Sequence, residues 1–150
     1  MQLDPNDIDL EAMEPSTMVK ASAALHAFAG LFVALTGLQL VGTRFVEPMV
    51  NAAPMVLLLL GITLVVLGAQ VYRAKGWTAV GGVVLGGVGA LTAFLWLGFS
   101  FVGGIFSLMA LLAVPVAGLA FLAALLARKD IVRVATYRQR LSDQGLDLGF

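Results

Sequence analysis

The sequence contains no cysteine, which excludes several kinds of chemistry at once. Disulfide bonds, thiolate nucleophiles, cysteine-ligated zinc and iron–sulfur clusters all require this residue. Histidine is nearly absent as well, since His26 is the only one in the chain. A zinc site needs three or four nitrogen, sulfur or oxygen ligands, and the sequence offers no cluster that supplies them. We therefore expect no bound metal and no cofactor.

Charge is also scarce, because only 12% of the residues are charged and 60% are hydrophobic. An ordinary soluble domain carries roughly a quarter charged residues. A soluble chain of this length buries only about two-thirds of its surface, so it would leave much apolar surface in water. The composition predicts an all-α integral membrane protein, with the lipid bilayer as its main partner.

Three stretches lack Asp, Glu, Lys and Arg altogether, namely residues 21–43, 48–72 and 76–127. A helix needs ~20 apolar residues to cross ~30 Å of hydrocarbon. The first two stretches each fit one span, and the third is long enough for two spans with a glycine-rich turn at residues 98–104. We predict an up-down bundle of four transmembrane helices within residues 16–127, at about 21–42, 52–72, 77–98 and 105–127.

The segments outside these spans differ in charge. Residues 1–15 are acidic and contain no Lys or Arg, whereas residues 128–150 are rich in Arg. Lys20, Arg73 and Lys75 fall on the same predicted side as the basic segment, and only Arg44 falls on the other. Because cytoplasmic flanks are enriched in Lys and Arg, both termini are expected in the cytoplasm, with the spans in a bacterial inner membrane. Residues 1–15 are then a flexible acidic cytoplasmic tail.

The basic C-terminal segment can continue as an amphipathic helix. Its apolar positions on one face are Ile131, Val134, Ala135 and Leu141. Its candidate contacts to anionic lipid headgroups are Arg128, Lys129, Arg133 and Arg140. Two interpretations are open. The helix lies on the inner leaflet with its basic residues at the headgroups, or the segment is a basic flank followed by a polar tail.

Three of the predicted spans carry small residues at alternating spacings of three and four. The first span has Ala23, Ala27, Gly30, Ala34 and Gly37; the third has Ala79, Gly82, Gly86, Gly89 and Ala93; the fourth has Ala110, Ala113, Ala117, Ala120 and Ala124. In lipid, Gly and Ala let helices approach closely, and this close approach supplies the attraction between them. We expect these stripes to be packing seams. The second span, rich in Leu and Val, is expected to face lipid most.

Two of these patterns allow more than one interpretation. Gly82 and Gly86 form a GxxxG motif, which serves either a right-handed dimer or packing within the chain. Gly30 and Gly86 are separated by the same offset as Gly42 and Gly98. A duplicated helical hairpin would explain that offset, and so would chance in a sequence of low complexity.

Polar side chains inside the spans are few, and intramembrane polar residues are the usual markers of function. His26 and Gln70 lie at similar depths and are predicted to form a polar pair between helices. A proton-handling or haem-ligating role for His26 is the alternative. Thr36, Thr63 and Thr92 are expected to donate to carbonyls of their own helices four residues earlier.

The sequence contains none of the motifs of hydrolases, nucleotide-binding loops or metalloproteases. We therefore expect a non-enzymatic packing, accessory or assembly subunit, acting as a homo-oligomer or with another membrane subunit, and no nucleic-acid partner. A small transporter or channel formed between copies is the second interpretation, with Thr36, Thr63 and Thr92 lining the pore. The third is an enzyme at the inner interface that uses His26 and the basic segment.

Overall fold

The computed structural model describes residues 10–41, 51–102 and 108–144, and their regular structure is entirely helical. The helices are α1 (Leu10–Met13), α2 (Thr17–Gln39), α3 (Ala53–Tyr72), α4 (Thr78–Val102) and α5 (Leu108–Asp143). Four of them, α2 to α5, are long and apolar enough to cross a membrane. The prediction of an all-helical chain with four helices of membrane-spanning length is therefore confirmed.

The starts of two helices follow from their sequences. Ser16 caps α2, because its side-chain oxygen accepts a hydrogen bond from the Val19 N–H at 3.4 Å. Pro54 lies in the first turn of α3, where a missing N–H costs nothing. Both residues are of types that are common at the starts of helices.

Two predicted boundaries were wrong. Helix α4 continues through Gly98 to Val102, so most of the turn expected at residues 98–104 is helical, and the rest lies outside the described residues. Part of the expected acidic tail is also ordered as a helix, since Leu10–Met13 forms one turn that contacts α5. Apolar contact explains this turn, because Met13 is only 4% exposed.

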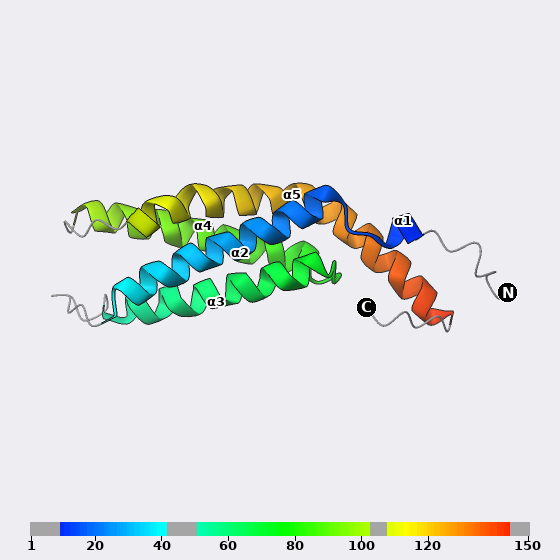
Figure 1. The fold of residues 1–150 in the computed structure, drawn as a ribbon, viewed down its shortest axis with the longest axis horizontal. Helices are drawn as coiled ribbons and strands as arrows, with labels where there is room; N and C mark the ends of the chain where they lie inside the picture. Colours follow the sequence, from blue (N-terminus) through cyan, green and yellow to red (C-terminus); the bar gives the residue numbers. More distant parts are fainter. Residues whose placement is uncertain (1–9, 42–50, 103–107, 145–150) are drawn as a thin grey trace.

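Helices α2 and α3 pack side by side in opposite directions (Figure 1). Their backbones are nearly in contact: a Cβ atom added at Gly30 would lie 2.5 Å from the Gly61 carbonyl oxygen. Further along the pair, a Cβ atom at Gly68 would lie 2.7 Å from the Ala23 carbonyl oxygen. Glycine is therefore what allows these two helices to approach so closely.

The other helices complete a ring in which each packs against two neighbours. Helix α5 contacts both α2 and α4, whereas α3 and α4 contact each other more sparsely. The alanines of α5 between Ala110 and Ala127 are buried, and several of them form much of the core together with Val33, Leu57 and Trp96. The core thus consists of small side chains on α5 facing larger ones on the other helices.

A tight turn joins α3 to α4 and defines one end of the molecule, which we call the basic end. Ala74 in this turn has a φ of 48°, in the left-handed region, and its side chain is 1% exposed. Lys20, Arg73 and Lys75 lie at this end, and their side chains are exposed. The opposite end, where α2 finishes and α3 begins, is called the distal end.

Helix α5 is the longest element. Its 36 residues correspond to about 54 Å, well beyond the ~30 Å of a hydrocarbon layer. Figure 1 shows its orange and red C-terminal part extending beyond the ends of α2, α3 and α4, next to α1. We call residues 128–143 of α5 the arm.

Candidate functional site

The residues predicted as packing seams lie inside the bundle. All of them are buried except Ala27 and Ala34, which are half-buried. The stripe on α2 faces α3, as the contacts of Gly30 and Gly37 with the α3 backbone show. The stripes on α4 and α5 meet each other, since a Cβ atom at Gly82 would lie 3.6 Å from the Ala124 Cβ.

The GxxxG motif is used within the chain. A Cβ atom at Gly86 would lie 3.0 Å from His26 Nε2 and 3.4 Å from the Phe121 Cα. Both Gly82 and Gly86 are buried by other helices of the same chain. The motif is therefore not available for a right-handed dimer in this arrangement.

The expectation that the second span faces lipid most was wrong. Helix α3 has its own seam, at Pro54, Gly61 and Gly68, and this seam packs directly on α2. Among the four long helices, α4 has the smallest fraction of residues that are buried inside the protein. The seam on α3 was missed because Leu57, Leu64 and Val71 occupy the positions between its small residues.

His26 is fully buried at the junction of α2 with α4 and α5. Its Nδ1 lies 2.8 Å from the Ser22 carbonyl oxygen, and its Nε2 lies 3.1 Å from the Gly82 carbonyl oxygen. The Ser22 hydroxyl is 3.5 Å from Nδ1. A neutral imidazole carries one N–H, which donates to one of these carbonyl oxygens. The ring therefore lies between the backbones of α2 and α4 and donates to one of them.

The predicted His26–Gln70 pair was wrong, because both ring nitrogens face backbone carbonyls instead. The reason is the absence of a side chain at Gly86, which lets the ring reach the α4 backbone. Gln70 lies half-buried on α3. Within the described ranges, no three His, Asp or Glu side chains are grouped to hold a metal ion.

Two of the three threonines behave as expected. Thr36 donates to the Phe32 carbonyl and Thr63 to the Leu59 carbonyl, each at 2.8 Å. Thr36 is also buried, at 2% exposed, so it faces the interior of the chain and does not line a pore between copies. In the described part of the chain, the Thr92 hydroxyl makes no such bond.

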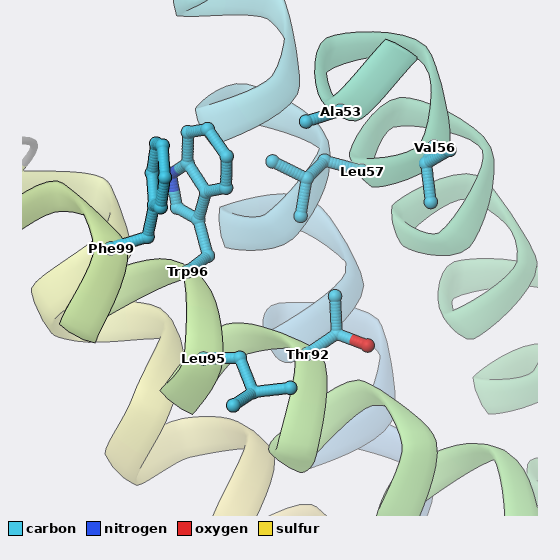
Figure 2. Close-up of a pocket in the computed structure, with 7 residues that line it drawn as sticks. All are labelled: Ala53, Val56, Leu57, Thr92, Leu95, Trp96 and Phe99. Atoms are coloured by element: carbon cyan, nitrogen blue, oxygen red, sulfur yellow. The ribbon is translucent and has the colours of Figure 1, made fainter. Parts of the chain in front are cut away.

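A cavity lies between α3 and α4 near the distal end (Figure 2). It measures about 320 Å³, and we call it the α3–α4 groove. Its lining residues are Ala53, Val56, Leu57, Thr92, Leu95, Trp96 and Phe99. The rings of Trp96 and Phe99 are 5.4 Å apart between centroids and form one wall.

The groove follows from the way α3 and α4 diverge. The two helices touch towards the basic end, where a Cβ atom at Gly89 would lie 2.8 Å from Leu64 Cδ1. They are joined only by the turn at the basic end, and their distal ends connect to different helices. No small-residue seam draws α3 and α4 together beyond Gly89, so the groove opens there.

A second feature fastens the basic end. Arg138 on the arm donates from Nη1 to the Arg73 carbonyl at 2.8 Å and from Nη2 to the Met13 carbonyl at 2.7 Å. The Ser16 hydroxyl donates to Asp130 Oδ2 at 2.7 Å. The arm therefore holds α1, the start of α2 and the α3–α4 turn together, a role that the sequence did not indicate.

The apolar face of the arm is buried inside the protein. Ile131 is 1% exposed and packs with Val19 and Val71, while Val134 and Leu141 are also buried. This face is therefore not free to lie on a leaflet, and that interpretation of the segment was wrong. The four basic residues predicted to contact headgroups are all exposed: Arg128, Lys129, Arg133 and Arg140.

Three of these basic residues share one face of the arm. Residues 129, 133 and 140 are separated by one and then two helical turns, so they lie on one side at 3.6 residues per turn. Ile131 and Val134 lie on the other side. We call Lys129, Arg133 and Arg140 the basic stripe.

Comparison of the chain with family models, curated proteins and solved structures finds no significant match.

Proposed function

We propose that this chain is a non-enzymatic accessory or assembly subunit of a membrane complex. In this proposal α2 to α5 cross the bilayer as an up-down bundle, with the basic end and both termini in the cytoplasm. The single observation that carries the proposal is the arm. It continues a helix that is long and apolar enough to cross a membrane, and it is hydrogen-bonded to three other parts of the chain.

The placement of polar groups supports a role in assembly over one in chemistry. The imidazole of His26 and the hydroxyls of Thr36, Thr63 and Ser100 are directed at backbone carbonyls of the same chain. The three hydroxyls bond to carbonyls of their own helices, and His26 lies against a carbonyl of α4, so these groups are used within the chain. The exposed faces of α3 and α4 consist largely of Leu, Val and Phe side chains suited to lipid or to another helix.

The basic stripe gives the proposed subunit a defined contact surface. Its three cations are exposed and face away from the buried side of the arm, towards the space where an acidic partner or anionic headgroups would lie. Arg133 also forms an ion pair with Asp130 on the arm, at 3.7 Å, and an acidic partner would compete with this pair. Near a membrane surface, each such cation contributes about 1 kcal/mol of attraction to anionic lipid. An acidic surface of a neighbouring subunit at the same level would be attracted in the same way.

Cross-linking in native membranes, followed by identification of the co-purified proteins, tests the proposal. We expect a reproducible adduct with another membrane subunit or with a second copy. The adduct should weaken when Lys129, Arg133 and Arg140 are all changed to Gln. The matched control changes Lys20, Arg73 and Lys75 to Gln, which removes the same charge elsewhere at the basic end. A chain that purifies as a lone monomer and gives no adduct contradicts the proposal.

A further inference from the structure

We propose that the α3–α4 groove is a binding site for one acyl chain of a membrane lipid. The inference rests on the membrane insertion in the proposed function, but it does not depend on any partner subunit. The groove lies in the distal half of two helices that are long and apolar enough to cross a bilayer. Hydrocarbon is then the medium that faces its opening.

The groove is large enough to hold part of a ligand. By comparison, the neighbouring void enclosed by all four long helices measures only about 10 Å³. The groove, at about 320 Å³, is comparable with the smaller ligand sites of proteins, which begin at about 300 Å³. The groove is open to its surroundings and not enclosed. Apolar atoms that enter it therefore gain contacts with several lining side chains at once.

Water is a poor occupant because the lining is apolar. An ordered water needs two to four polar partners, and only Thr92 among the lining side chains carries a polar group other than the indole N–H of Trp96. Figure 2 shows Thr92 on the α4 side of the groove, with its hydroxyl pointing away from Leu95 and Trp96. These surroundings favour a hydrocarbon.

The shape of the groove favours a single chain over a helix. From Thr92 to Phe99 it extends over seven residues of α4, about 10 Å. Beyond it, towards the basic end, contact between Leu64 and Gly89 closes the space between α3 and α4. A transmembrane helix is about 10–12 Å across with its side chains and would need the whole length of the interface. A flexible acyl chain entering from the distal end needs only this short channel.

The two tryptophans provide the probe. Trp96 lines the groove and is 9% exposed, whereas Trp77 lies near the basic end and is 55% exposed. We would reconstitute Trp77→Phe, which reports Trp96, and Trp96→Phe, which reports Trp77, in bilayers containing lipids brominated on the acyl chain. Bromine quenches tryptophan only at short range. We expect Trp96 to be quenched despite its burial, and at a lower fraction of brominated lipid than Trp77.

Substitutions that fill the groove then test whether the quenching comes from inside it. In the Trp77→Phe background, Ala53→Phe and Thr92→Leu should abolish most of the quenching of Trp96. Leu119→Phe, at an exposed site on α5, is the matched control and should leave the quenching unchanged. If Ala53→Phe fails to fold by circular dichroism, Val56→Phe takes its place.

The outcomes separate this inference from the proposed function. Absence of quenching at both tryptophans contradicts membrane insertion and so removes both proposals. Quenching of Trp77 together with Trp96 quenching that the filled variants do not change shows surrounding lipid only, and overturns the acyl-chain site alone. Trp96 that becomes sensitive only after a bound protein is removed shows that a partner occupies the groove, and this also overturns the site.

Discussion

At the scale of single residues, the structure depends on a few positions where a side chain is missing. Gly30 and Gly61 bring α2 and α3 so close that each would place a Cβ atom on the partner's backbone. Gly86 leaves the space that His26 occupies. In a bilayer, where helices gain little from hydrophobic burial, such close approach is the main source of attraction between them.

Gly61→Ala is expected to destabilise the bundle by at least about 1–3 kcal/mol, the usual cost of overpacking. The added methyl would lie 2.5 Å from the Gly30 carbonyl oxygen, so the two helices must separate. Reversible unfolding in mixed detergent micelles measures the change. Gly118→Ala is the control, because its methyl would meet nothing within 4 Å. Equal stability of the two variants would show that α2 and α3 do not pack through this seam.

His26→Ala is expected to lower the free energy of unfolding by about 0.6–2 kcal/mol, the range for polar contacts between membrane helices. The prediction takes the tautomer in which the Nε2–H donates to the Gly82 carbonyl on α4, so that His26→Ala removes a hydrogen bond between two helices. Gln70→Ala serves as the comparison. In a double-mutant cycle, the effects of His26→Ala and Gln70→Ala on the free energy of unfolding should add. A coupling energy between them would instead show that the two side chains interact, as predicted from the sequence.

At the scale of elements, the arm of α5 is held in place by hydrogen bonds from one of its side chains to backbone carbonyls of other segments. The guanidinium of Arg138 reaches two carbonyls on different segments with two nitrogens of its planar fork. Lysine offers one point charge and cannot reproduce that geometry. The position of α1 and of the α3–α4 turn therefore depends on the shape of this side chain as well as on its charge.

Arg138→Lys is expected to release α1 and the turn at Arg73 while the four long helices stay folded. Hydrogen bonds to charged groups contribute about 1.5–3 kcal/mol each, so the local opening should become far more frequent. Hydrogen–deuterium exchange of peptides covering residues 10–16 and 73–77 measures it. Arg140→Lys, two residues away and exposed, is the control. Unchanged protection in Arg138→Lys would contradict this role.

How much could be predicted from the sequence differs between these scales. Uncharged runs of sufficient length predicted the four long helices, since length and hydropathy are properties of the chain itself. The partners of His26 and Arg138 could not be predicted, because both bind backbone carbonyls, which leave no residue-specific pattern. The α3–α4 groove was also missed, since it results from the divergence of two helices in space.

At the scale of the whole molecule, charge is divided unevenly, because the charged residues of the described ranges all lie at the basic end or on the arm. The exposed cations Lys20, Arg73 and Lys75 lie at the basic end, which also carries the arm with its basic stripe. Such a division is what orients a membrane protein with its positive side in the cytoplasm. The absence of cysteine makes the orientation easy to test, because a single introduced thiol has no background.

Single cysteines at Ser16, Asn51 and Ser142 are expected to divide by side. In intact cells, a membrane-impermeant thiol reagent should label the cysteine at position 51 and leave those at positions 16 and 142 unlabelled until the membrane is opened. The reason is that position 51 lies at the distal end and the other two at the basic end. Labelling of position 142 from outside would reverse the proposed orientation.

The seam between α2 and α3 has a consequence for the synthesis of the chain. Its contacts lie between α2 and α3, so the seam itself needs no residue after Tyr72. At 5–20 residues per second, the ribosome takes roughly 4–16 s to add residues 73–150. During that interval, α2 and α3 can pair while the imidazole of His26 still lacks the Gly82 carbonyl. Helices α4 and α5 then pack against α2 and α3 when these two are already paired.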